Sequence, residues 1–169
     1  MISIGSTAPA WKATAYKNGE FVTLSSDDYK GKWVVIYWWP FDFSGICNSE
    51  ILGFQQLEAG FAEIGVELIG VSCDTKYAHQ KWFSDPDAFA NGEPGHVAIA
   101  DNSHKMTQDF GMYFEPAGCA VRGTVLVDPN GVVQSVGANF LSVARDPNDI
   151  LITARAFANG GGCTLSQRI

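Results

Sequence analysis

The 169-residue sequence lacks the patterns that mark several classes of protein. Its four cysteines stand far apart and form no Cys-x-x-Cys pair, which excludes a zinc knuckle and a paired-dithiol redox motif. No apolar run approaches the roughly 20 residues that a membrane-spanning helix needs. Residues 1–16 carry no basic segment followed by a long apolar run. We therefore expect no secretory signal, no membrane partner and a cytoplasmic protein.

Positive charge is also scarce in this chain. It carries 11 Lys and Arg against 18 Asp and Glu, which gives a formal net charge of -7. This balance disfavours nucleic acid as a partner, because neutralising phosphates needs Lys and Arg. Hydrophobic residues make up 46% of the chain, which is typical of a folded globular protein. In a reducing cytosol we expect single thiols rather than a disulfide framework.

Apolar runs alternate with helical periodicity through the first two thirds of the chain. We expect buried strands over 32–39, 66–72 and 96–100, because each run is apolar and rich in β-branched residues. We expect helices over 45–64, 75–84 and 103–110. The first of these helices has an apolar stripe formed by Ile51, Phe54, Leu57, Phe61 and Ile64. This alternation is typical of parallel strands joined by crossover helices.

The last third of the chain has a different pattern. Two β-rich runs flank Asn130-Gly131, a strong signal for a tight turn and an antiparallel hairpin. A final helix follows, with Asp146 or Asn148 as its cap and the glycines at 160–162 as its end. We therefore expect an α/β protein of thioredoxin-like fold, with a mixed central sheet flanked by helices on both faces. A single domain is expected over 1–160, with a short flexible tail over 161–169.

A single thiol, Cys47, lies where a helix is expected to begin after a buried strand. Unpaired N–H groups and the positive end of the helix dipole favour a thiolate at this position. Pro40 ends the strand and can shield the thiol from water. Ser44 can cap the helix or bind an oxygen atom beside the sulfur. A free cysteine at a helix start is, however, more often a small packing residue.

The surrounding residues resemble the peroxiredoxins. Their signature is Pro, three residues, Thr or Ser, two residues and Cys, and this chain has Pro40-Phe-Asp-Phe-Ser44-Gly-Ile-Cys47. The likeness continues in "SCDTKYAHQKW", in "GCAVRGTVLVDPNG" with Arg122, and in "SVARDPNDIL" with Arg145. The closest branch is the alkyl hydroperoxide reductase C, or 2-Cys, branch. Several ordered motifs along one chain are more specific than any one of them.

The resemblance implies a thiol-dependent peroxidase that reduces H2O2 and organic hydroperoxides. Cys47 would attack the peroxide and become a sulfenic acid, with no metal, haem or other cofactor. Arg122 would stabilise both the thiolate and the transition state. Ser44 would hold the peroxide, Glu50 would orient Arg122, and Arg145 would support the charges from further away. Pro40 would shield the sulfur.

Turnover would then require a second thiol. In two-cysteine relatives a cysteine near the C-terminus of the partner subunit forms a disulfide, and Cys163 is the candidate here. The usual Val-Cys-Pro sequence is absent around it, and Asn48 replaces a proline that commonly follows the reactive cysteine. A one-cysteine cycle resolved by an external thiol is therefore an alternative. The resemblance implies two partners, a thiol reductant protein and a second copy in a homodimer, with a ring of dimers as the alternative assembly.

Other features favour structural interpretations. His79 and Trp82 are expected to be packing or interface residues rather than catalysts. Cys73 lies in a buried strand pattern and is expected to be inert, and Cys119 is expected to be structural. A redox sensor or holdase chaperone on the same fold is a second functional class.

Overall fold

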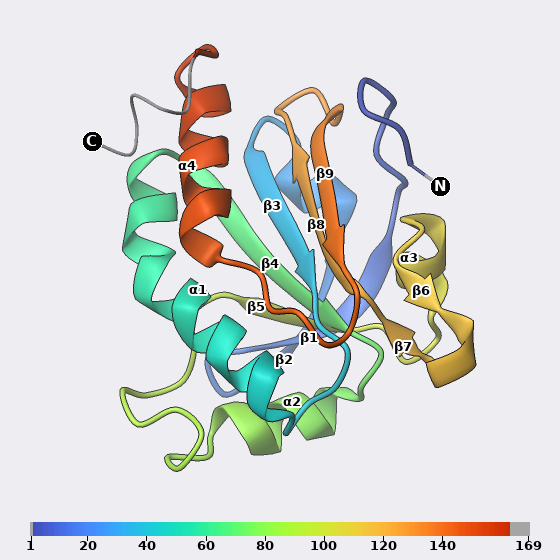
Figure 1. The fold of residues 1–169 in the computed structure, drawn as a ribbon, viewed down its shortest axis with the longest axis vertical. Helices are drawn as coiled ribbons and strands as arrows, with labels where there is room; N and C mark the ends of the chain where they lie inside the picture. Colours follow the sequence, from blue (N-terminus) through green and yellow to red (C-terminus); the bar gives the residue numbers. More distant parts are fainter. Residues whose placement is uncertain (1, 163–169) are drawn as a thin grey trace.

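The fold, seen in a computed structural model that describes residues 2–162, is built on one mixed seven-stranded sheet (Figure 1). The order across this sheet is β2-β1-β5-β4-β3-β8-β9. Its strands are β1 (Lys12–Lys17), β2 (Glu20–Ser25), β3 (Trp33–Trp38), β4 (Val66–Ser72), β5 (Val97–Ala100), β8 (Arg122–Val127) and β9 (Val133–Asn139). A separate small pair consists of β6 (Tyr113–Phe114) and β7 (Cys119–Ala120).

The central strands have the parallel pairing that the alternating pattern predicts. β3 pairs with β4 and β4 with β5, both in parallel. β8 joins the other side of β3 in the antiparallel direction, and β9 pairs with β8 beyond the turn at Asn130-Gly131. The mixed sheet and the hairpin at Asn130-Gly131 are therefore as predicted, and most predicted element boundaries are within one or two residues of those observed. Arg122 is the first residue of β8.

Helices cover both faces of the sheet, as expected. On one face α1 (Gly45–Glu63), α2 (Lys76–Phe83) and α4 (Pro147–Ala158) share a core with Val35, Tyr37 and Trp39 of the sheet region. On the other face the short α3 (Lys105–Asp109) and the segment after it pack against Val34, Ile36 and Trp38. Figure 1 shows α1 and α4 side by side, with α3 on the opposite side of the sheet.

The apolar stripe of α1 accounts for its position on the sheet. Ile51, Phe54 and Phe61 are buried, and Leu57 and Ile64 pack against the same core. Burying each large apolar side chain stabilises the fold by about 1.5–3 kcal/mol. This gain outweighs the lower intrinsic helix propensity of the aromatic residues. The stripe thus fixes which face of α1 packs against the sheet.

The β1–β2 hairpin is the element that sequence analysis missed. Its strands are short and alternate apolar with polar residues instead of forming apolar runs. The sequence does contain a signal for this hairpin, the dipeptide Asn18-Gly19 at its turn. Both residues have positive φ angles, 48° and 85°. That conformation matches the primed hairpin turns that Asn-Gly favours. The same sequence signal identified the hairpin at Asn130-Gly131.

The N-caps of α4 and α1 can be compared with those expected from the sequence. Asp146 is the N-cap of α4, and its carboxylate accepts from Asn148 N at 2.9 Å. Ser44 is the N-cap of α1 by position, but its side chain makes no capping hydrogen bond. Of the two roles that the sequence left open for the Ser44 hydroxyl, capping is therefore not the one seen here. Within residues 2–162, no helix has both the length and the apolar character needed to cross a membrane.

Candidate active site

Cys47 lies in the first turn of α1, directly after the loop that leaves β3. Trp39 N still donates to Val71 O at 3.0 Å, and the chain bends at the buried Pro40. Phe43 then adopts a left-handed conformation with φ 60°, which is uncommon for a residue with a large side chain. Such backbone strain is often concentrated at functional sites. The loop delivers the Cys47 side chain to a position where it is 0% exposed.

A buried carboxylate holds this loop in place. The Asp42 carboxylate accepts from Trp39 Nε1 at 2.8 Å and lies 2.7 Å from His79 Nδ1. The side chains of Asp42 and His79 are both almost fully buried. Asp42 N donates to Asp74 Oδ2 at 3.0 Å. Burial and the nearby Asp42 carboxylate raise the pKa of Asp74. His79 therefore supports the loop from α2, and Asp42 is a site residue that sequence analysis missed.

The buried Trp82 packs beside the same loop. Its ring centroid lies 5.7 Å from that of Phe43 and 5.6 Å from that of Phe89. Trp82 is 2% exposed, whereas Phe43 is 58% exposed at the surface. This placement agrees with the packing role that the sequence favoured for Trp82.

A network of three buried charged side chains faces the sulfur of Cys47. Arg122 Nη1 lies 3.5 Å from Cys47 Sγ and also donates to Glu50 Oε2. Glu50 Oε1 accepts from the backbone N and Nε of Arg145 at 2.7 and 3.0 Å. Two guanidinium groups thus share one carboxylate, which leaves one positive charge in excess beside the sulfur. In a site this dry, that excess charge stabilises negative charge on the sulfur or on a bound oxygen.

Backbone carbonyl groups complete the hydrogen bonds of the two arginines. Arg122 Nε donates to Leu141 O at 2.9 Å. Arg145 Nη1 donates to Gly123 O and lies 3.2 Å from Thr124 Oγ1. Each guanidinium is therefore held from two sides, which satisfies the requirement that buried charges be paired and hydrogen-bonded.

The structure brings four of the predicted site residues into direct contact: Cys47, Arg122, Glu50 and Arg145. Pro40 and Ser44 lie in the loop and at the helix start that precede Cys47. Cys163 lies outside the described residues. Among residues 2–162, no group of three or more His, Cys, Asp or Glu side chains is arranged to hold a metal ion.

The two other described thiols lie in environments that disfavour ionisation. Cys73 follows β4, and burial raises its pKa to about 12. Burial, and then the nearby Cys47, raise the pKa of Cys119. A thiol whose pKa is raised stays protonated at neutral pH and is a poor nucleophile. Both environments agree with the structural interpretation of these residues.

Asn48 strengthens the first turn of α1. Its backbone N donates to Ser44 O at 2.8 Å, and its side-chain Nδ2 donates to Ala88 O at 3.1 Å. A proline at this position has no N–H and no side-chain donor, so it would make neither bond. The departure from the family pattern noted in the sequence thus adds two hydrogen bonds next to Cys47.

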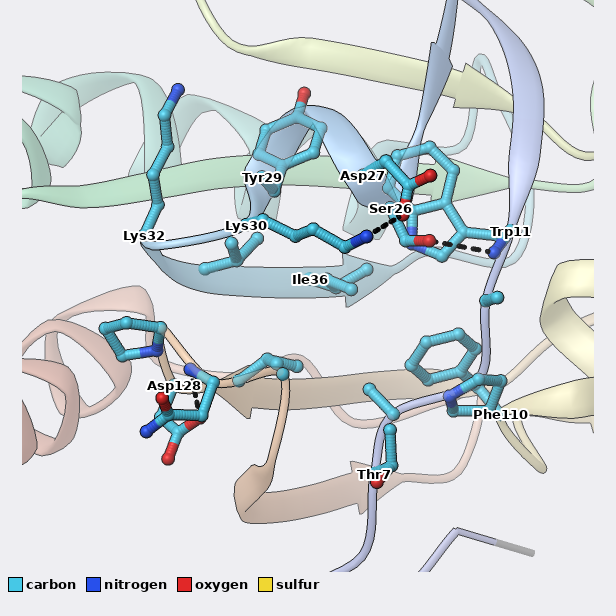
Figure 2. Close-up of a pocket in the computed structure, with 18 residues that line it drawn as sticks. Thr7, Trp11, Ser26, Asp27, Tyr29, Lys30, Lys32, Ile36, Phe110 and Asp128 are labelled. Carbon is cyan, nitrogen blue, oxygen red and sulfur yellow. Dashed lines mark hydrogen bonds and ion pairs between the residues drawn. The ribbon is translucent and has the colours of Figure 1, made fainter.

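Two cavities of the described chain do not include Cys47 in their lining. One, of about 450 Å³, opens on the opposite face of the sheet between Trp11, Tyr29, Ile36 and Phe110 (Figure 2). The other, of about 460 Å³, lies between β9 and α4 and includes Arg145 and Thr124 in its lining. Cys47 lines neither cavity.

The fold and the site define a thioredoxin-like protein with one thiol held against a buried arginine. A family model described as AhpC/TSA family matches residues 4–136. The chain therefore belongs to the AhpC/TSA family of peroxiredoxins, which confirms the resemblance seen in its motifs.

Individual relatives agree with this assignment. The chain is 39% identical over 153 residues to a mitochondrial thioredoxin-dependent peroxide reductase of Mus musculus, covering 89% of this chain and 59% of the relative. It is 38% identical to peroxiredoxin tpx1 of Schizosaccharomyces pombe, covering 92% and 82% of the two chains. Among solved structures, Mycobacterium tuberculosis AhpC matches with TM-score 0.89 and 29% identity over 98% of each chain. The chain thus spans 59% of the length of the mouse relative.

Proposed function

We propose that this chain is a thiol peroxidase that reduces H2O2 and organic hydroperoxides through Cys47. The observation that carries the proposal is the 3.5 Å contact between Arg122 Nη1 and the buried Cys47 Sγ at the start of α1. A thiolate there attacks the terminal peroxide oxygen, the O–O bond breaks, and the sulfur becomes a sulfenic acid. The departing oxygen takes up a proton and leaves as water or an alcohol.

In this proposal the residues around Cys47 have different roles in stabilising the charges of the reaction. Negative charge moves from the sulfur to the departing oxygen, and Arg122 has donors enough to contact both atoms. Glu50 and Arg145 hold Arg122 in place through the contacts described above. The Ser44 hydroxyl, which does not cap the helix, binds the peroxide, and Pro40 excludes water.

Assembly with a second copy forms part of the proposal. β9 is the last strand of the sheet, and apart from Val133, which bonds to Gly5 and Ser6 of the N-terminal segment, its outer side has no neighbouring strand within the described chain. An edge strand of this kind offers unpaired backbone groups that a second copy can pair with in a two-fold dimer. The mouse relative and a human one are both named thioredoxin-dependent peroxide reductase, which supports a thioredoxin-type protein as reductant. A ring of such dimers is the alternative assembly.

A turnover assay separates an enzyme from a redox sensor. With H2O2 or an alkyl hydroperoxide in excess and a thioredoxin system as reductant, we expect many peroxide molecules consumed per chain. The physical reason is that the sulfenic acid is reset without loss of the thiol. Oxidation that stops after one equivalent and only alters the size of the assembly would instead identify a sensor or holdase.

Disulfide mapping tests the proposed role of Cys163. After one equivalent of peroxide, non-reducing electrophoresis and peptide mapping should show a covalent dimer joined through Cys47 and Cys163. Cys163→Ser should keep the first oxidation but lose this disulfide, because no second thiol then attacks the sulfenic acid. Pairing of Cys47 with Cys119 or Cys73 would refute this role. A sulfenic acid that persists in the unaltered chain would favour the one-cysteine cycle.

A further inference from the structure

A hydrogen-bonded chain of three side chains connects α1, the start of β5 and the centre of β3. Glu58 Oε1 accepts from His96 Nδ1 at 2.6 Å, and also from the backbone N of Gly95 and of His96 at 2.8 and 3.1 Å. His96 Nε2 lies 2.6 Å from the hydroxyl oxygen of Tyr37. Tyr37 and His96 are buried, whereas the Glu58 side chain is 29% exposed. The chain therefore leads from the surface into the core.

The partners assign the protons along this chain. A carboxylate can only accept, so His96 Nδ1 carries the proton that it donates to Glu58. Burial raises the pKa of Tyr37 well above its usual value, so the phenol keeps its proton. In the Nδ1–H tautomer of His96, Nε2 accepts from the Tyr37 hydroxyl, and the facing polar atoms of the three side chains are all hydrogen-bonded.

The hydroxyl of Tyr37 fits closely against the neighbouring strand. A Cβ atom on Gly70 of β4 would lie 2.9 Å from this oxygen and 2.6 Å from the ring of Trp39. Such contacts are too short for any side chain, so only glycine allows the two rings to pack here. The His96 bond and the bare backbone of Gly70 together fix the position of the Tyr37 ring.

The ring of Tyr37 forms one side of the Arg145 environment. It stacks on Phe54 with a centroid distance of 3.9 Å and an interplanar angle of 19°. The guanidinium carbon of Arg145 lies 5.5 Å from the Tyr37 centroid and 5.9 Å from that of Phe54. Because these two distances are similar and the rings are close together, the guanidinium lies beside the stacked pair and not over one face. The two rings thus form an apolar wall next to Arg145.

This wall adjoins the charge network that reaches the sulfur. Arg145 binds Glu50, Glu50 binds Arg122, and Arg122 contacts Cys47. An apolar wall excludes water from these ion pairs and so strengthens them. A shift of the Tyr37 ring would change the space available to Arg145 and, through Glu50, the position of Arg122.

We propose that Glu58, His96 and Tyr37 are positioning residues for peroxide reduction. They hold the Tyr37–Phe54 wall in the place that sets the Arg122 guanidinium against Cys47. This inference rests on the proposed function and adds three residues that touch neither the sulfur nor its direct partners by hydrogen bond.

The test measures the second-order rate constant for oxidation of Cys47 by H2O2 in stopped-flow experiments. Tyr37→Phe keeps the ring and its stacking but removes the hydroxyl, and we expect a rate about fivefold lower, the scale of one hydrogen bond. His96→Leu should have a similar effect. The double variant should be no slower than His96→Leu alone, because that substitution already breaks the bond that Tyr37→Phe removes. His96→Gln, whose amide oxygen can accept from Tyr37, should recover most of the rate.

Tyr16→Phe is the matched control. Tyr16 is also buried in this core, and its hydroxyl also makes a side-chain hydrogen bond, in this case to Glu93 Oε2 at 2.7 Å. Its ring contacts Phe21 and Phe83 instead of Arg145, so the rate should not change. Thermal unfolding of each variant confirms that it is folded, and nitrogen NMR should show a proton on His96 Nδ1 and none on Nε2.

The outcomes separate the two proposals. A wild-type rate in folded Tyr37→Phe, an equal loss in Tyr16→Phe, or a proton on His96 Nε2 would overturn the positioning role. So would losses that multiply in the double variant. A wild-type chain that does not react rapidly with peroxide would refute the proposed function itself.

Discussion

Replacement of Cys47 by serine is expected to abolish peroxide turnover. A hydroxyl group in this site stays protonated and does not form a sulfenic acid, so no other step of the cycle can begin. The loss should be at least roughly 1,000-fold, the scale seen when a covalent nucleophile is removed from an enzyme. Serine is slightly smaller than the fully buried cysteine, so the fold should persist. Peroxide consumption with a thioredoxin system measures the effect.

Cys73→Ser is the control for this substitution. Cys73 is partly buried, its sulfur lies 3.8 Å from Thr107 Oγ1, and burial raises its pKa to about 12. This variant should retain its turnover. Rapid peroxide turnover by Cys47→Ser, or its loss in folded Cys73→Ser, would refute Cys47 as the nucleophile.

Replacement of Arg122 by leucine has the second largest expected effect. It removes the guanidinium that contacts Cys47 Sγ and leaves the site without its nearest positive charge. The rate of Cys47 oxidation should fall about 100- to 1,000-fold, as when one donor to a developing charge is removed. Glu50 keeps Arg145 as a partner, so its buried charge stays paired and the protein should remain folded. Stopped-flow oxidation by H2O2 measures the rate.

Arg155→Leu is the matched control for Arg122→Leu. Arg155 lies in the last turn of α4, and no contact joins its side chain to Cys47, Glu50 or Arg145 within the described chain. Its replacement removes the same charge from the protein and should leave the rate unchanged. Equal rates for Arg122→Leu and the wild type would contradict the assignment of transition-state stabilisation to Arg122.

The sequence predicts the central layer of the fold well, for a physical reason. Strands such as 66–72 are buried on both faces, so nearly every residue is apolar and the pattern is unambiguous. The β1–β2 hairpin at the margin of the sheet has partly exposed strands, and its mixed composition carries little signal apart from Asn18-Gly19. Edge elements depend on their neighbours for stability, and those neighbours are not visible in a local window.

The site shows the same division between local and long-range information. Cys47, Ser44 and Pro40 lie in one motif whose spacing is visible in the sequence, and Arg122 was found from the resemblance of a second motif. The bond from Asp42 to His79 joins residues 37 positions apart, and the one from Tyr37 to His96 joins residues 59 positions apart. These pairs exist because the sheet places β3 and β5 on either side of β4 and because α2 packs into the core on the same face, which no spacing rule reveals.

The role of Ser44 shows a limit of another kind. Its position at the start of α1 was predicted, but the direction of its hydroxyl was not. A side-chain rotamer depends on the packing around it, and several rotamers are compatible with a helix N-cap. Sequence patterns therefore locate a residue more reliably than they assign its hydrogen bonds.

The most direct test of the central claim is to oxidise the wild-type chain with one equivalent of H2O2 and trap the sulfenic acid. Dimedone labelling followed by peptide mapping should place a single adduct on Cys47. The oxidation rate constant from stopped flow should be at least about 10⁴ M⁻¹ s⁻¹, the lower end of enzyme efficiencies. An adduct on Cys73 or Cys119, or a rate no faster than that of glutathione, would contradict the account.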